Sequence, residues 1–271
     1  MWVDVIDLRD FYATPLGRLV RRAVRRQLRA LWPDVSGQRV VGVGFATPYL
    51  GQFREEADRV VTIMPPAQGV MHWPTGEPGA VALAEDVAMP FPDRSMDCIL
   101  LVHALESSAY FRDLLRECWR VLADGGRLIV VVPNRRGLWS RIERTPFAQG
   151  RPYSMGQLDR LLRDVLFAPA VKTTALFFPP MWWPRFMSWA LGVERIGRRF
   201  FPTIAGVNIV EATKQIYAAP PAAVSARRLK DYVFVPGAAP VRSINIAAPA
   251  RKASDAAFNA EAAPEQTKPA R

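Results

Sequence analysis

The sequence predicts an α/β fold built around a mostly parallel sheet. Two apolar runs of strand length, Cys98–Val102 and Arg127–Val132, flank Tyr110–Leu122, in which apolar residues recur at helical spacing. Wholly apolar runs of this length suit strands that are buried on both faces. A strand–helix–strand unit with so long a connection forms a parallel, right-handed crossover.

Turn residues bound this central unit on both sides. Pro90–Asp93 forms a turn that leads into the first of the two strands. Ala123–Gly126 ends the helix, because its glycines accept left-handed dihedral angles. The two cysteines, Cys98 and Cys118, fall on faces predicted to be buried, and we interpret them as small core hydrophobes.

Upstream of this unit, the pattern alternates between helix and strand. Residues 7–31 predict one or two amphipathic helices with an apolar stripe on one side and arginines on the other; Pro15 opens or interrupts them. Four elements are then expected, in order a strand, a helix, a strand and a short strand: Arg39–Val43, Pro48–Ala57, Arg59–Met64 and Ala80–Leu83.

Downstream, a helix capped by Ser154 is expected to run to Leu166, followed by strands at Lys172–Phe178 and Val207–Tyr217. After residue 217 the chain becomes rich in Ala, Pro, Arg and Lys and loses its periodicity, which is typical of a disordered tail. We therefore divide the chain into an N-terminal helical cap (1–37), one α/β domain (38–217, with an insertion at about 179–203) and a basic tail (218–271).

Composition narrows the classes of partner and location. The net charge of +11 favours anionic partners, but no motif of an RNA- or DNA-reading module accompanies the arginines, so specific nucleic-acid binding is not expected. Two cysteines and two histidines without ligand spacing predict neither a disulfide framework nor a metal site. With no secretory signal and no apolar run long enough to span a membrane, the sequence favours a cytoplasmic location.

A set of fixed offsets around the central unit resembles the class I S-adenosylmethionine (SAM)-dependent methyltransferases of the small-molecule "type 11" kind. The residues that carry the resemblance are Met89–Asp93, Asp97, Glu117, Arg120–Leu122, Gly125–Gly126 and Pro133–Asn134. The resemblance implies a Rossmann-like sheet whose last two strands form an antiparallel hairpin at one edge. It also implies SAM as cofactor and methyl transfer to an O, N or C nucleophile of a small molecule.

The resemblance places the cofactor loop after the first strand, at Gly44, Phe45 and Ala46. A glycine-rich turn lets backbone N–H groups approach a ligand without an intervening Cβ. This chain departs from the family pattern, because Gly42 stands where an acid is usual, and Ala46 and Pro48 replace two glycines. We expect Gly42, Gly44, Phe45 and Ala46 to lie at the cofactor.

Two further strand ends are assigned to the cofactor by the same resemblance. The second strand ends at Met64, where the family usually has an acid that accepts the ribose hydroxyls; Gln68 is the nearest polar substitute. After the third strand, Glu85 and Asp86 occupy the place of the acid that binds the adenine amine, and Glu85 aligns better than Asp86. The alternative for this pair is a solvated loop.

His103 follows the fourth strand, at the edge where α/β sheets bind ligands. A neutral imidazole there could accept a proton from the substrate, so His103 is the candidate catalytic base. The alternatives are a wall of the cofactor or substrate pocket and a structural histidine. Glu106 shares the loop and could serve in either role.

A block dense in aromatic residues, including Trp182, Trp183 and Phe186, lies between the last two expected strands. It could cover an apolar acceptor, contact a membrane surface or a partner protein, or pack as an inserted helix. Two other functions remain open at this stage. One is an inactive methyltransferase fold that binds a partner, and the other is a peripheral binder of RNA or anionic lipid through the basic surface.

Overall fold

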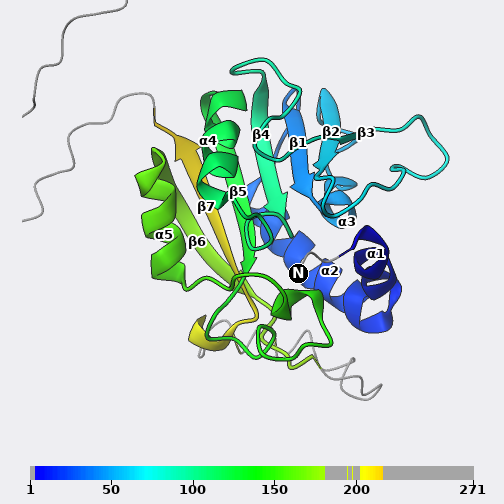
Figure 1. The fold of residues 1–271 in the computed structure, drawn as a ribbon, viewed down its shortest axis with the longest axis vertical. Helices are drawn as coiled ribbons and strands as arrows, with labels where there is room; N and C mark the ends of the chain where they lie inside the picture. Colours follow the sequence, from blue (N-terminus) through cyan, green and yellow to red (C-terminus); the bar gives the residue numbers. More distant parts are fainter. Residues whose placement is uncertain (1–3, 181–193, 195–196, 198–201, 216–271) are drawn as a thin grey trace, which may run out of the picture. The chain divides into compact units, whose positions relative to one another are not determined.

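The computed structural model describes residues 4–180, 194, 197 and 202–215 (Figure 1). Its described strands form one sheet in the order β3-β2-β1-β4-β5-β7-β6. In chain order they are β1 (Arg39–Gly44), β2 (Arg59–Met64), β3 (Val81–Leu83), β4 (Met96–Val102), β5 (Leu122–Pro133), β6 (Phe167–Ala175) and β7 (Val207–Lys214). The first five strands pair in parallel, and β7 runs antiparallel to both β5 and β6. The predicted fold class, including the antiparallel edge, is confirmed.

Helices cover both faces of the sheet (Figure 1). On one face, α4 (Phe111–Val121) and α5 (Met155–Asp164) pack in a core that includes Val41 and Val43 of β1. On the other, α1 (Val5–Ala13) and α2 (Pro15–Leu31) pack in a core that includes Val40. Neighbouring residues of β1 thus face opposite cores, as the pleat of a strand requires. Because helices cover both faces of the sheet, strands in its interior are apolar on both of their faces.

The N-terminal segment forms two helices, because Pro15 begins the second one. Asp4 caps α1 through its side chain, and the Thr14 hydroxyl accepts a hydrogen bond from the Gly17 amide at the start of α2. Pro15 fits the first helical position, where its missing N–H costs no intrahelical bond. None of the described helices is long and apolar enough to cross a membrane.

Three elements differ most from the sequence-based expectation. β5 begins at Leu122, so it includes Ala123–Gly126, which were expected to form the turn before it. The helix expected to run to about Ala57 is the single turn α3 (Thr47–Leu50), although Gly51 directly after it still has right-handed helical dihedral angles. β6 lies earlier than Lys172–Phe178, because Leu166 and Leu176, just outside its ends, take positive φ angles of 65° and 67°. An extended strand cannot continue through such a residue.

A charged cluster fixes the turn before β4 to α4. The Glu117 carboxylate accepts hydrogen bonds from the Met89 amide at 2.6 Å and from the Arg120 guanidinium at 2.6 and 2.8 Å. Arg120 also donates to the carbonyl oxygens of Met89 and Phe91. These bonds give Glu117 and Arg120, two of the residues that carry the family resemblance, a structural role. The hydrogen bond from Arg120 is the main cause of the lowered pKa of Glu117.

Glu117→Ala is expected to destabilise the fold by about 2 kcal/mol, because the Met89 amide and Arg120 lose a charged partner. Since folding lowers the pKa of Glu117, its contribution is present above the unfolded-state pKa and is lost as the pH falls through the folded-state value. Urea unfolding at neutral and acidic pH measures both effects. Asp113→Ala is the control, because its ion pair with Arg116 on the same helix is exposed. Equal losses in the two variants would contradict this role of Glu117.

Three sequence-based assignments lie outside the described residues. The aromatic block with Trp182, Trp183 and Phe186 falls there, and so does the tail from residue 218. The expected end of the last strand, residues 215–217, is described only as far as residue 215.

Candidate functional site

The loop after β1 makes a close contact with the end of β4. Gly44 has a φ of +77°, and a Cβ there would lie 2.5 Å from the backbone oxygen of Val102 and 2.9 Å from Ala104 Cβ. The Phe45 amide donates to the same Val102 oxygen at 2.9 Å. Glycine is therefore required at position 44 by the protein's own backbone.

Gly42 lies under this loop. A Cβ at Gly42 would come within 2.6 Å of both Ala46 Cβ and Leu50 Cδ1. The side chains of Phe45, Ala46 and Leu50 are buried around it. The missing acid at position 42 thus has a local cause, because α3 packs directly on β1 and leaves no space for a side chain.

The end of β2 is apolar, and α1 is attached just beyond it. Met64 is fully buried, and Gln68 follows in a tight turn. The Val5 amide at the start of α1 donates to the Gln68 backbone oxygen at 2.8 Å. The Gln68 side-chain amide donates to the His103 backbone oxygen at 3.1 Å. Gln68 therefore connects the ends of β2 and β4 and holds α1 beside them.

His103 lies at the carboxyl end of β4 with both ring nitrogens near a polar group. Its Nε2 is 2.9 Å from the Tyr12 hydroxyl, which is 2.8 Å from the Tyr49 hydroxyl. Its Nδ1 is 3.3 Å from Glu106 Oε1. The ring is 2% exposed, and its backbone has a left-handed φ of 51°. Such backbone strain occurs preferentially at functional sites.

Aromatic rings enclose this polar chain. The Tyr12 ring stacks on Phe45 at a centroid distance of 5.7 Å, and the His103 ring lies 4.9 Å from Phe147. Burial raises the pKa of both tyrosines, so Tyr12 and Tyr49 stay protonated at neutral pH and can donate hydrogen bonds. The hydrogen bonds are consistent if the Tyr49 hydroxyl donates to the Tyr12 hydroxyl, which donates to His103 Nε2. The imidazole proton then lies on Nδ1, beside Glu106.

The acid pair after β3 is divided between two environments. Glu85 is exposed, whereas Asp86 is buried with only 6% of its surface accessible. The Asp86 Oδ2 atom has no hydrogen-bond partner among the described residues. A buried carboxylate oxygen without a partner is costly unless a ligand or water meets it. Its burial and its unpartnered oxygen make Asp86 a better candidate for the acid of this loop than Glu85, the residue that the family resemblance prefers.

Two other buried oxygens of this region share that property. Gln68 Oε1, beyond β2, and Glu106 Oε2, beyond β4, also have no partner in the described part of the chain. With Asp86 beyond β3, unpartnered acceptors follow the ends of β3, β2 and β4, the strands on one side of the sheet together with β1, which lies between β2 and β4. This is the edge at which ligands bind to parallel α/β sheets. The arrangement suits a ligand that presents several hydrogen-bond donors.

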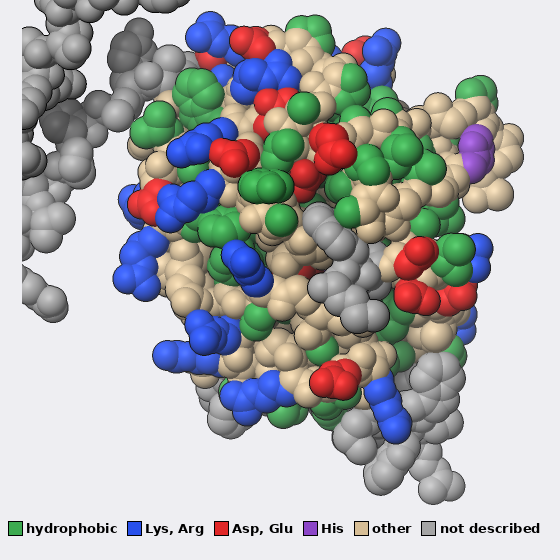
Figure 2. Space-filling view, in the orientation of Figure 1, with side chains coloured by type: hydrophobic (Ala, Val, Ile, Leu, Met, Phe, Trp, Pro, Cys, Tyr) green, Lys and Arg blue, Asp and Glu red, His purple; other side chains and the backbone are tan. Residues whose placement is uncertain are grey.

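A cavity of about 690 Å³ lies next to Glu106, between the starts of α4 and α5. Its wall includes Gly150 and Arg151, and the Arg151 amide donates to the Glu106 backbone oxygen at 2.8 Å. Phe111 and Tyr153 add aromatic surface. The buried Tyr153 hydroxyl has no partner among the described residues, and burial raises the pKa of Tyr153 to about 12. Figure 2 shows this face of the molecule, where arginine and lysine side chains gather along one side.

Sequence reasoning missed Tyr12, Tyr49 and Phe147, which surround His103 in the structure. Tyr12 belongs to a helix 91 positions before His103, and no local pattern in α1 indicates that contact. A hydroxyl on the otherwise apolar side of an amphipathic helix is the signal that could have drawn attention to it.

Comparisons with known proteins show which proteins the chain resembles. Residues 27–130 match a family model described as a methyltransferase domain. The demethylmenaquinone methyltransferase of Thermus thermophilus is 30% identical over 122 residues, which cover 44% of this chain and 49% of that protein. An uncharacterized protein of Mycobacterium tuberculosis is 27% identical over 181 residues, which cover 63% of this chain and 60% of that protein. The chain thus spans about half the length of the first of these relatives and less than two thirds of the second.

A solved structure shows the same fold. A SAM-dependent methyltransferase from Thermotoga maritima superimposes with a TM-score of 0.54 at 18% identity, covering 78% of this chain and 96% of that one. At this identity the likeness establishes the arrangement of strands and helices.

Proposed function

We propose that this protein binds SAM and transfers a methyl group to an O, N or C nucleophile of a small molecule; the match of residues 27–130 to the methyltransferase domain model and the likeness of the fold to a SAM-dependent methyltransferase support this. The observation that carries the proposal is the set of unpartnered buried oxygens beyond β2, β3 and β4. They lie at the edge of the sheet where the resemblance places the cofactor.

The residues present fit the donors of SAM. Asp86 would accept from the adenine amine, and Gln68 would accept from a ribose hydroxyl in place of the usual acid. The backbone of Phe45 and Ala46 would lie along the methionine part, with Met64 as an apolar wall. SAM, when bound, supplies a methyl group activated by a sulfonium centre.

The protein's own contribution is orientation and exclusion of water. In-line methyl transfer requires aligned reactants and a dry site more than covalent help. Tyr12, Phe45 and Phe147 provide an apolar enclosure around His103. Tyr12 comes from α1, so movement of this helix would both open the enclosure and release Nε2 of His103.

His103 is the proposed proton acceptor for the acceptor nucleophile. In the described arrangement Tyr12 occupies Nε2, so proton transfer requires the Tyr12 hydroxyl to give way to the substrate. Glu106 beside Nδ1 would then stabilise the imidazolium that forms. The cavity lined by Gly150, Phe111 and Tyr153 is the proposed place of the acceptor, since its wall adjoins Glu106.

His103→Asn is expected to lower methyl transfer by about 100-fold, the lower end of what a positioned base contributes. Asparagine tolerates the left-handed backbone at this position, so the loop should persist. The measurement is mass-spectrometric detection of labelled methyl groups passed from SAM to a small-molecule extract. His72→Asn is the matched control, because the side chain of this other histidine is exposed and bonds only the Glu77 backbone oxygen. Unchanged transfer in His103→Asn would remove His103 from the chemistry.

A further inference from the structure

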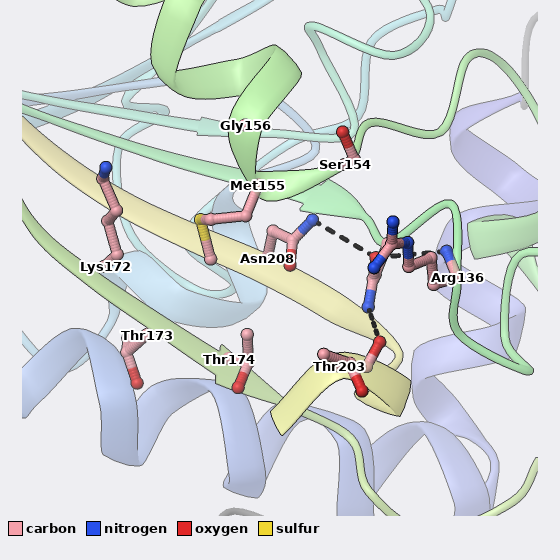
Figure 3. A pocket seen from close by; sticks show the side chains of 10 residues that line it. Arg136, Ser154, Met155, Gly156, Lys172, Thr173, Thr174, Thr203 and Asn208 are labelled. Atoms are coloured by element: carbon pink, nitrogen blue, oxygen red, sulfur yellow. Dashed lines mark hydrogen bonds between the residues drawn. The ribbon is translucent and has the colours of Figure 1, made fainter. Parts of the chain in front are cut away.

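A second cavity, of about 560 Å³, lies between the start of α5, the strands β6 and β7, and the short helix η2 (Pro202–Ile204). This volume is in the range of small-ligand sites. In Figure 3, Arg136 lies on one side of the cavity and Lys172 on the other, with Met155, Asn208 and Thr174 between them. No carboxylate is among the described residues that line it.

The positive charge at this cavity is only partly neutralised. Lys172 pairs with Asp159 at 2.6 Å. The Arg136 side chain is exposed and has no ion pair or hydrogen bond within the described ranges. Its backbone is held by a bond from its amide to Asn134 Oδ1 at 3.2 Å. A guanidinium that is anchored through its backbone and free at its head is suited to bind an oxyanion.

The start of α5 adds two backbone donors. Ser154 and Gln157 form a reciprocal capping box, which uses the amides of these two residues. The amides of Met155 and Gly156 lie between them and have no backbone or side-chain partner in the described structure. A Cβ at Gly156 would meet nothing within 4 Å, so the approach to this helix end is open. Free amides and the helix dipole together favour an anion.

Asn208 points to a ligand independently of Arg136 and of the start of α5. It is 2% exposed, and its Nδ2 donates to the Tyr153 backbone oxygen at 2.8 Å and to Asn134 Oδ1 at 3.5 Å. These bonds fix the amide so that Oδ1 points away from Asn134 and toward the cavity (Figure 3). Both hydrogen bonds of the Asn208 side chain to described residues use Nδ2, so Oδ1 is left to accept from a ligand. Thr174, its partner across the β6–β7 ladder, adds a hydroxyl to the same wall.

We propose that this cavity binds a small oxyanion that carries a neighbouring hydroxyl group, such as a polyol phosphate. The oxyanion is held by Arg136 and by the amides of Met155 and Gly156. The ligand hydroxyl donates to Asn208 Oδ1 and accepts from Thr174. The proposal does not depend on SAM or on methyl transfer, because none of these residues belongs to the site described above.

The test is amide NMR of the full chain titrated with glycerol 3-phosphate and, separately, with inorganic phosphate. The Met155 and Gly156 resonances are expected to shift with both probes, and glycerol 3-phosphate should bind about threefold or more tightly than phosphate, as one extra hydrogen bond allows. Arg136→Ala should weaken both by about tenfold. Thr174→Val, which keeps the side-chain shape, should weaken only glycerol 3-phosphate.

Arg144→Ala is the control, because this exposed arginine lies in the same loop and lines neither described cavity. Absence of shifts at Met155 and Gly156 would overturn the anion site. An equal loss in Arg144→Ala and Arg136→Ala would show non-specific attraction and would overturn it as well. Equal binding of the two probes would remove the hydroxyl from the proposal, and the ligand would then be a simple oxyanion.

Discussion

Asp86→Ala is expected to weaken SAM binding by about 5- to 150-fold, the equivalent of roughly 1–3 kcal/mol. The residue is buried, and its Oδ2 has no partner among the described residues, so the carboxylate can be fully engaged by the adenine amine. Removing it would leave that amine desolvated and unpaired, and this explains the size of the loss.

Glu85→Ala is the matched variant for this test. Glu85 is the adjacent residue of the same type of charge, but it is exposed and should change the affinity by less than about twofold. Calorimetric titration with SAM measures both. A loss in Glu85→Ala without a loss in Asp86→Ala would show that the alignment identifies the acid correctly and that the burial of Asp86 has another cause.

Gly44→Ala is expected to destabilise the whole domain by about 2–5 kcal/mol. The left-handed backbone costs a non-glycine residue roughly 1–2 kcal/mol, and overpacking adds roughly 1–3 kcal/mol. The overlap is severe because the new Cβ would meet the backbone of β4 at 2.5 Å, and two parallel strands of the sheet cannot separate locally. A side chain at this position therefore affects folding before it affects a ligand.

Gly37→Ala isolates the steric part of this effect. Gly37 also has a positive φ, of 68°, but a Cβ there would meet nothing within 4 Å. Its cost should be limited to about 1 kcal/mol of backbone strain. Thermal unfolding should therefore show a fall in Tm of roughly 5–10 °C for Gly44→Ala and a clearly smaller fall for Gly37→Ala. Equal falls would contradict the close contact with β4.

The sheet and its helices could be predicted because their determinants are local. The uninterrupted apolar run of β4 and the helical spacing of α4 identify each element without reference to the rest of the chain. Ser154 as the cap of α5 was predictable for the same reason, since the capping box needs only Ser154 and Gln157. The antiparallel edge came from the family resemblance, and the antiparallel pairing of β7 with β5 and β6 confirms it.

The interior of the candidate site could not be predicted in the same way, because it depends on contacts across the fold. Tyr12 meets His103 only after α1 has packed against the strand ends, and Gln68 provides the attachment. Which of Glu85 and Asp86 is buried depends on how the loop after β3 turns. A shift of the loop by one residue would bury the other acid instead.

The central claim is that this domain binds SAM despite its altered loop at Gly42, Ala46 and Pro48. Calorimetric titration of the full chain with SAM and with S-adenosylhomocysteine tests it most directly. We expect saturable binding of both compounds with one site per chain, and loss of affinity in Asp86→Ala. No heat with either compound, from protein shown to be folded, would contradict the claim and would identify the chain as a methyltransferase fold that does not bind this cofactor.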